Sequence, residues 1–574
     1  MSPPESAGRP PPAPLKDPVR LEVFKQLFAA VAEEMGGVLR RSSFSPNIKE
    51  RRDFSCAVFD ARGRMVAQAA HIPVHLGAMP LSVLRCVEEL ELGPGDVGIL
   101  NDPFRGGTHL PDITLVTPVF EESSPPRLLG FVASRAHHAD VGGISPGSMG
   151  LARTLNEEGL VIPPIKLVAS GRPVPAVWAM LRANVRTPRE REGDLRAQLA
   201  ANERGAARLR AVVRRYGIDA VDSAMAGLLR YAERSVRALL ARLPDGSYRF
   251  EDHLDDDGIS PEPVPIRVTL TVRGDGAVVD FTGSGEQCAG PLNAVYAIVV
   301  SACFYAFRSL VGREIPSNAG CLVPVRVVAP EGTVVNARPP AAVAGGNVET
   351  SQRIVDVLLG ALAQACPARV PAASQGTMNN LTIGGWNPER HRPFAYYETV
   401  GGGCGARPDR DGASAVHSHM TNTLNTPVEA LEFAYPLRVK RYEVRRGSGG
   451  EGRYRGGDGI RRDVELLVPA HVSVLSERRA RGPYGLAGGE AGRPGRNVLV
   501  RGGAEKELPG KVELDALPGD VISIRTPGGG GHGAATRPPA GGSAPTSLEG
   551  SSGSNDADER RGSVPPVPDG RSGE

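Results

Sequence analysis

The chain has 574 residues, of which 40% are hydrophobic and 23% are charged, as in an ordinary globular protein. This length exceeds what one hydrophobic core usually spans, so we expect two or three lobes. The 67 basic and 64 acidic residues give a net charge of +3 without a long basic block, which argues against binding to nucleic acid or to an anionic membrane. The seven cysteines include no C-x-x-C pair and no apolar run reaches about 18 residues, which predicts a cytoplasmic protein with reduced thiols and no membrane span.

The chain opens with a proline-rich arm at residues 1–17, which cannot form a packed element. Apolar residues then recur at helical spacing over 19–41, which predicts an amphipathic helix. Two β-type runs, at 54–59 and 64–69, flank the turn sequence DARG and predict a hairpin.

The next elements are short β-type runs at 97–100, 113–120 and 128–133. A long helical region follows over 187–243, in which we expect Gly217 to separate two helices. A polar stripe runs along the first of these helices, and a solvated face is its favoured interpretation; it consists of Asp194, Gln198 and Asn202.

Strands dominate again from about residue 245. An alternating pattern on either side of the turn at 274–276 predicts an antiparallel hairpin, and the stretch 430–526 contains further short strands. Two apolar stretches between them, 294–310 and 355–365, predict buried helices. We therefore predict an α+β fold with a metal-site lobe at 18–245, a second lobe at 246–532 and a disordered Gly/Ser/Pro-rich tail at 533–574.

Two histidine clusters, THLPD at 108–112 and RAHHADVGG at 135–143, lie near each other in a chain that has only 11 histidines. Neutral imidazole and carboxylate ligands suit zinc, manganese or iron(II), and three such ligands leave positions for water and substrate. The predicted metal ligands are His109, His137 and Asp140, with Asp112 and His138 as groups that orient ligands or transfer protons. Alternatively, the clusters are polar residues gathered on solvated loops.

Other histidines are weaker candidates. His71 and His75 are four positions apart, but Pro73 between them argues against a helix. Alternation would place His417 and His419 on one face of a strand.

Glycine-rich stretches at 401–407 and 527–533 could present backbone N–H groups to an anion. Neither stretch matches a phosphate-binding loop, so the sequence gives little support for ATP binding by this chain itself. Cys404, which lies in the first of them, is a weak nucleophile candidate without an adjacent base.

Several segments together resemble the B subunits of hydantoinase and 5-oxoprolinase, a family that includes the acetone carboxylase α subunit. The resemblance runs from about residue 18 to 533. The matching segments are RRDFSC at 51–56, NDPFRGGTHLPD at 101–112, RAHHADVGG at 135–143, EGLVIPPIKL at 158–167, GDLRAQ at 193–198, NAGC at 318–321, TNT at 421–423 and PVE at 427–429.

The resemblance implies a B-type subunit that holds a divalent metal, manganese or zinc, and works with a separate HyuA-type ATPase subunit in a hetero-oligomer. The partner would phosphorylate the substrate, and this chain would complete the hydrolysis of a 5-oxoproline or hydantoin ring. The positions that match the family's metal ligands are His109, His137 and Asp140. Arg105 and Lys166 are candidates for binding a substrate carboxylate or phosphate. The alternatives are an ATP-dependent acetone or acetophenone carboxylase subunit and a scaffold subunit without chemistry of its own.

Overall fold

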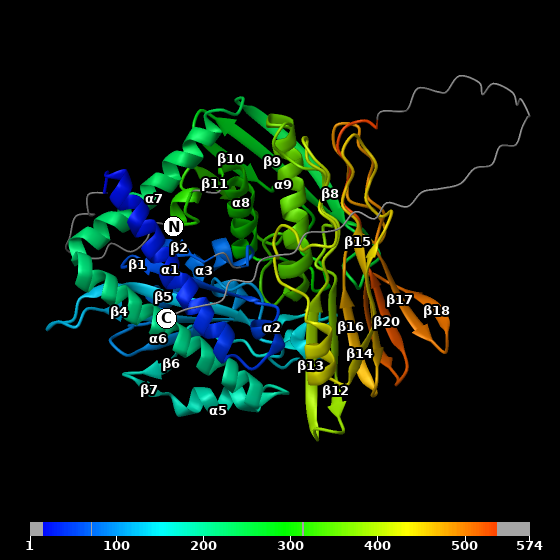
Figure 1. Cartoon of the computed structure of the whole chain (residues 1–574), viewed down its shortest axis with the longest axis horizontal. Helices are drawn as coiled ribbons and strands as arrows, with labels where there is room; N and C mark the ends of the chain where they lie inside the picture. The colour runs from blue at the N-terminus through cyan, green and yellow to red at the C-terminus, as the bar shows by residue number, and fades with distance from the viewer. Residues whose placement is uncertain (1–14, 70–71, 313–314, 536–574) are drawn as a thin grey trace, which may run out of the picture. The chain divides into compact units, whose positions relative to one another are not determined.

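The computed structural model describes residues 15–69, 72–312 and 315–535. Its first sheet has seven antiparallel strands in the order β2-β1-β5-β4-β3-β6-β7 (Figure 1). The strands are β1 (Phe54–Asp60), β2 (Met65–Gln68), β3 (Val97–Leu100), β4 (Asp112–Phe120), β5 (Leu128–His137), β6 (Ile165–Ala169) and β7 (Arg172–Pro173). The predicted hairpin is confirmed as β1 and β2, and the three β-type runs are confirmed as β3, β4 and β5.

Three long helices pack together against the first sheet (Figure 1). They are α1 (Pro18–Ser42), α6 (Pro188–Tyr216) and α7 (Ile218–Leu240). Gly217 adopts a φ of +79° and separates α6 from α7, as predicted. Shorter helices in this half of the chain are α2 (Pro46–Lys49), α3 (His75–Glu89), α4 (Leu155–Glu158) and α5 (Pro175–Ala183), with 3-10 turns η1 (Pro103–Arg105) and η2 (Pro146–Ser148).

The interpretation of the polar stripe on α6 as a solvated face is wrong, because all three side chains are buried. Asp194 Oδ1 accepts hydrogen bonds from the backbone N–H groups of Phe44 and Ser45. Gln198 and Asn202 donate to carbonyl oxygens of β4. The stripe thus fastens α6 to the first sheet and to the segment after α1.

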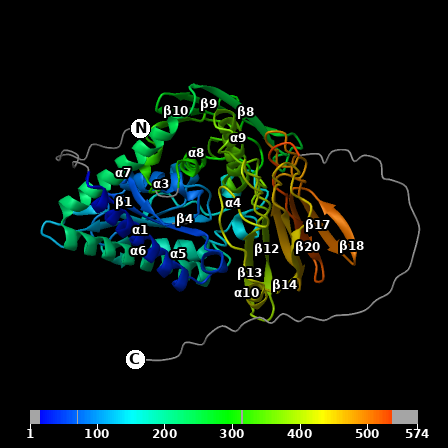
Figure 2. The same cartoon turned by 45° about the horizontal axis from the view of Figure 1, so that its top comes forward.

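The second sheet has the order β11-β10-β9-β8, in which only the β10–β11 pair is parallel. Helices bridge the two sheets: α3 contacts the first sheet and α8, α8 contacts α9, and α9 contacts β8 and β9 (Figure 2). These elements are β8 (Gly246–Leu254), β9 (Val264–Arg273), β10 (Gly276–Asp280), β11 (Val325–Val328), α8 (Tyr296–Val311), α9 (Ser351–Ala365) and the 3-10 turn η3 (Ala319–Leu322). Both predicted buried helices and the predicted hairpin are confirmed.

Two further antiparallel sheets share one apolar core near the end of the described chain. One has the order β13-β12-β16-β19 and the other β14-β15-β20-β17-β18. Their elements are β12 (Asn380–Asn387), β13 (Arg392–Thr399), α10 (Val428–Ala434), β14 (Leu437–Arg445), β15 (Gly459–Leu466), β16 (Ala470–Leu475), β17 (Arg496–Arg501), β18 (Ala504–Leu508), β19 (Lys511–Ala516) and β20 (Val521–Arg525).

The α+β fold class is confirmed. The largest buried core includes residues on both sides of position 245, such as Leu239 and Ile266, and the division into two lobes there stays a prediction. Most of the predicted arm and tail lie outside the described residues. Among the described residues, no helix combines the length and apolar character needed to cross a bilayer.

A five-residue π-helical turn, η4 (Gly346–Thr350), leads directly into α9. Its first residue packs so closely that a Cβ on Gly346 would lie 1.9 Å from the Asn293 carbonyl oxygen. We expect Gly346→Ala to lower the free energy of unfolding by about 3 kcal/mol, as measured by denaturant titration. Gly37→Ala in α1 is the matched control, because its nearest neighbour would be a side-chain atom at 3.7 Å. Equal effects of the two substitutions would contradict the close packing of the turn.

Glu158, the last residue of α4, is buried and joins this helix to the segment before η4. Its Oε1 accepts hydrogen bonds from the N–H groups of Val343 at 2.7 Å and Ala344 at 2.8 Å, while Oε2 has no hydrogen-bond partner among the described residues. Burial raises the pKa of Glu158 from 4.5 to about 8.

This shift predicts a stability change with pH. The folded state holds the proton of Glu158 between pH 4.5 and about 8, whereas the unfolded state releases it, so stability falls as pH rises through that interval. Glu158→Gln should remove about 1.4 kcal/mol per pH unit of that dependence. Unfolding titrations of the wild type and of Glu158→Gln at pH 5, 6, 7 and 8 measure this dependence. If the free energies of unfolding of the two proteins change with pH in parallel, Glu158 does not hold the proton.

Candidate metal centre

The strand pairing of the first sheet brings three potential metal ligands together. Asp112 is the first residue of β4 and His137 is the last residue of β5, and the two are register partners. A tight turn before β4, closed by a hydrogen bond from the Asp112 N–H to the His109 carbonyl, brings the His109 side chain back to them. Ligand atoms of all three residues lie within 4.8 Å of one another.

The three side chains are buried and have unused ligand atoms. Asp112 Oδ1 lies 3.3 Å from His109 Nε2 and 3.6 Å from His137 Nδ1. Both ring nitrogens of His109 and the Nε2 of His137 have no hydrogen-bond partner among the described residues. Buried polar atoms in proteins nearly always have a partner, so this arrangement fits a cation that the three residues would hold.

The electrostatics of Asp112 and His137 favours protonation states in which both can bind a metal. Burial opposes ionisation of Asp112, but the nearby His109 and His75 outweigh it and hold the pKa of this carboxyl well below its usual value. Burial lowers the pKa of His137 and so favours the neutral ring. An ionised Asp112 and a neutral His137 ring are both able to bind a divalent metal.

Two side chains orient Asp112 through its second oxygen, Oδ2. Thr108 Oγ1 donates to it at 2.6 Å, and His75 Nε2 lies 3.3 Å away, while His75 Nδ1 lies 2.9 Å from Ser55 Oγ. His75 therefore belongs to the site as the first residue of α3, although Pro73 argued against a helix. His71 lies outside the described residues.

Tyr397 on β13 fixes the imidazole of His137. The two rings stack with centroids 4.5 Å apart and an angle of 7° between their planes. The Tyr397 hydroxyl donates to Asn380 Oδ1 at 2.8 Å, and the buried Arg51 guanidinium lies 4.9 Å from the tyrosine ring. Sequence reasoning missed Tyr397 because it lies far from His137 along the chain and no local pattern marks it.

Two members of the group, Asp112 and His137, line a cavity whose other lining residues come mainly from the second half of the chain. Both apolar and polar side chains line the cavity. Its lining residues are Asp53, Ile72, Val74, His75, Asp112, His137, Asn347, Val348, Met378, Tyr397, Thr399, Met420 and Thr421.

The structure places Asp140 and His138 outside this group. Asp140 is buried, and its two carboxylate oxygens accept hydrogen bonds from the backbone and the guanidinium of Arg186 at 2.7 and 2.8 Å. His138 Nε2 lies 2.9 Å from Gln198 Oε1, and burial lowers the pKa of His138 to about 4. The geometry thus differs from the predicted ligand set: Asp112 occupies the position expected for Asp140, because strand register sets it opposite His137.

Arg105 and Lys166 are engaged in ion pairs elsewhere. Arg105 is exposed and pairs with Glu89 at 3.0 Å, and Lys166 pairs with Asp96 at 2.8 Å. Neither lines the cavity. Of the remaining histidine candidates, His419 lies 3.2 Å from the hydroxyl of Tyr305, whereas the next two residues, 420 and 421, reach the cavity wall.

Comparison with known proteins shows the family to which this chain belongs. Residues 17–535 match the family described as Hydantoinase B/oxoprolinase. The 5-oxoprolinase 1 of Arabidopsis thaliana is 41% identical over 547 residues, which cover 90% of this chain but only 42% of that protein. A protein named as the putative B subunit of a D-/L-hydantoinase from Pseudomonas sp. (strain NS671) is 34% identical, with 90% of each chain covered.

A solved structure shares the fold. The crystal structure of the ATP-dependent caprolactamase from Pseudomonas jessenii superimposes with a TM-score of 0.83 and 30% sequence identity, and the match covers 90% of this chain and 91% of that one. This chain spans less than half the length of most of the curated relatives that it matches.

Proposed function

Because the chain belongs to the hydantoinase B/oxoprolinase family, we propose that it is the B-type, metal-binding subunit of an ATP-dependent cyclic amidase that opens 5-oxoproline or hydantoin-type rings. The buried group of His109, Asp112 and His137, of which Asp112 and His137 line a cavity, carries this proposal. Relatives named as a 5-oxoprolinase, a hydantoinase B subunit and a caprolactamase support it, since each name refers to a cyclic amide.

The chain's own residues would bind and orient the reacting groups. His109, Asp112 and His137 would hold a divalent metal, Mn²⁺ or Zn²⁺, which when bound supplies Lewis acidity next to the cavity. His75 and Thr108 donate hydrogen bonds to Asp112 and so keep its carboxylate aimed at the other two ligands. Tyr397 holds the plane of the His137 ring.

ATP enters this reaction through a partner. The amide of an unstrained lactam is a poor electrophile, and phosphorylation of its oxygen would activate the ring carbon for attack by water. The C–N bond would then break to leave an open-chain acyl phosphate, and a second water would release phosphate and the carboxylate. The sequence has no phosphate-binding loop motif, so we assign the phosphorylation to an A-type ATPase subunit in a cytoplasmic hetero-oligomer. The hydantoinase relative has a matching length, while the 5-oxoprolinases are more than twice as long, which supports a division of the activity between two chains.

Elemental analysis of the purified chain and ATP-dependent ring opening of 5-oxoproline with the A-type partner test the proposal. We expect stoichiometric metal and partner-dependent turnover in the wild type, and loss of both in His137→Ala. His471→Ala on β16, outside the cavity lining, is the matched control. Metal without ring opening of any lactam would favour a ketone carboxylase, and a metal-free chain that still supports turnover would favour a scaffold.

A further inference from the structure

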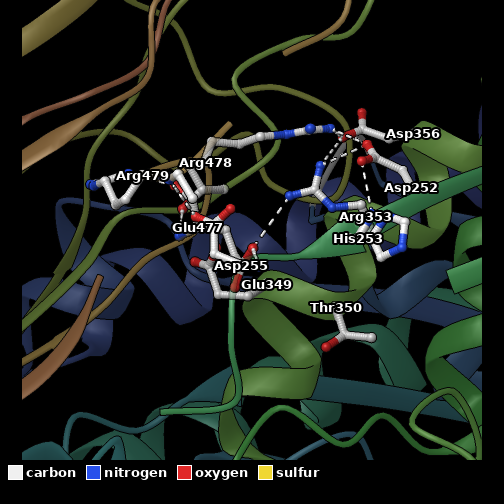
Figure 3. Close-up of polar contacts among 12 residues, drawn as sticks. Asp252, His253, Asp255, Glu349, Thr350, Arg353, Asp356, Glu477, Arg478 and Arg479 are labelled. Carbon is white, nitrogen blue, oxygen red and sulfur yellow. Dashed lines mark hydrogen bonds and ion pairs between the residues drawn. The ribbon is translucent and has the colours of Figure 1, made fainter. Parts of the chain in front are cut away.

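Arg135 is a fully buried cation without an ion-pair partner among the described residues. Four arginines are among the largest fully buried side chains, namely Arg51, Arg135, Arg353 and Arg462. Arg353 contacts three carboxylates (Figure 3), Arg462 lies 2.7 Å from Glu398, and Arg51 lies 3.7 Å from Asp53. Arg135 alone of the four forms no ion pair with a described carboxylate, although burial of a lone charge is costly.

Hydroxyl groups take the place of a carboxylate around this guanidinium. Its Nε donates to Thr114 Oγ1 at 2.8 Å, and its Nη2 donates to Ser82 Oγ at 2.6 Å. Its Nη1 has no hydrogen-bond partner among the described residues. Because hydroxyl oxygens carry no net charge, these contacts leave the positive charge of Arg135 without a balancing anion.

Strand register places this charge beside the candidate metal ligands. Arg135 precedes His137 by two residues on β5, so both side chains point to the same face of the sheet. Their register partners on β4 are Thr114 and Asp112, and two residues span about 7 Å along a strand. The guanidinium and the Asp112 carboxylate therefore lie in one buried layer, which α3 covers.

Asp112 is the carboxylate whose charge acts on Arg135. Burial lowers the pKa of Arg135 to about 10, and the charge of Asp112 opposes that fall, so the guanidinium is protonated at neutral pH. Asp53, which lines the cavity, lies near Arg51. With both carboxyls ionised, these two aspartates and two arginines carry no net charge together. A divalent ion would add its whole charge to this group.

We propose that Arg135 acts on the metal centre through Asp112: its fixed charge balances the carboxylate and thereby lowers the affinity of the centre for a divalent ion. This inference rests on the proposed function and deepens it. A carboxylate that a guanidinium already balances neutralises less of the charge of a bound metal, which keeps that ion a stronger Lewis acid. Arg135 is thus a positioning residue that favours polarisation of the substrate over tight metal binding.

Competition with a chromogenic chelator, with Zn²⁺ as the probe, tests the inference without turnover. Arg135→Met removes the repelling charge, and we expect its Kd for Zn²⁺ to be at least tenfold lower than that of the wild type. At an effective dielectric constant of about 20, a unit charge and a divalent ion on the order of 10 Å apart repel by more than this. Damage to the fold would act in the opposite direction, because a distorted site binds metal more weakly.

Two control variants separate the charge from the hydrogen bonds. Thr114→Val and Ser82→Ala each remove one acceptor of Arg135 and keep its charge, so both should retain the wild-type Kd for Zn²⁺. Thermal unfolding verifies that each variant is folded. Arg135→Gln, which is uncharged but can still donate a hydrogen bond, replaces Arg135→Met if the methionine variant is not folded.

The outcomes separate this inference from the proposed function. A folded, uncharged variant whose Kd for Zn²⁺ is unchanged or higher overturns the role of Arg135 and leaves the amidase proposal intact. An equal fall of the Kd in Thr114→Val overturns it as well, because hydrogen bonding would then set the affinity. Tighter binding in Arg135→Met beside a wild type without ring-opening activity supports the inference and counts against the amidase. A wild type that binds no Zn²⁺ overturns both.

Discussion

Asp112→Asn should abolish stoichiometric metal binding, whereas Asp140→Asn should retain it. Asp112 is the only carboxylate in the group formed with His109 and His137, and an amide oxygen is a much weaker ligand for a divalent ion than an ionised carboxylate. We expect metal affinity to fall by about 100-fold and partner-dependent turnover to fall with it.

The Asp140 variant is the matched control, because it makes the same substitution in a buried carboxylate outside the metal group. Both oxygens of Asp140 are occupied by Arg186, so its loss should lower the free energy of unfolding by about 2 kcal/mol and leave the metal content unchanged. Competition with a chromogenic chelator gives the metal affinity of both variants. Loss of metal in Asp140→Asn, with retention in Asp112→Asn, would restore the ligand set predicted from the sequence.

We propose Asp112 in place of Asp140 as the third metal ligand, and this difference from the sequence prediction shows where sequence reasoning reaches its limit. The two histidines were found by composition and position, because imidazole clusters are rare in this chain. Choosing the carboxylate required the register of β4 against β5, which pairs Asp112 with His137. Spacing along the chain favoured Asp140, three positions after His137. Asp140, however, lies beyond the end of β5 and accepts hydrogen bonds from Arg186.

Local patterns predicted the elements well, because periodicity reports which face of each element is buried. The helix α1 and the α6–α7 break at Gly217 follow directly from such patterns. The prediction of a solvated face for the polar stripe on α6 was wrong, because it relied on polar residues at helical spacing usually being solvated. Gln198 and Asn202 instead donate hydrogen bonds to carbonyl oxygens of β4. Asn347 and Tyr397 reach the cavity from the second half of the chain, far in sequence from the candidate metal ligands, and only tertiary structure brings them there.

Arg353→Met should lower the free energy of unfolding by about 3–5 kcal/mol at neutral pH. The guanidinium is fully buried, and its removal takes one cation from a cluster of three carboxylates, Asp252, Asp356 and Glu477 (Figure 3). Arg478 stays paired with the two aspartates and Lys511 with Glu477, so the variant has one unbalanced negative charge beside an apolar side chain. Breaking a buried ionic group by deleting one partner is costly because the remaining charges stay desolvated. Denaturant titration measures the loss. Arg237→Met is the matched control, since Arg237 makes a more exposed pair with Glu233 on α7 and should change stability by less than about 1 kcal/mol.

The pH dependence of this loss tests its electrostatic origin. Burial raises the pKa of Asp356 and Arg353 opposes that rise, so the carboxyl of the variant should bind a proton more readily in the folded state than in the unfolded state. A folded-state pKa above the unfolded value means that stability is regained as pH falls. The deficit of Arg353→Met relative to the wild type should therefore be larger at pH 9 than at pH 6. A deficit that is the same at both pH values would mean that lost packing of the long side chain, and not unbalanced charge, destabilises the variant.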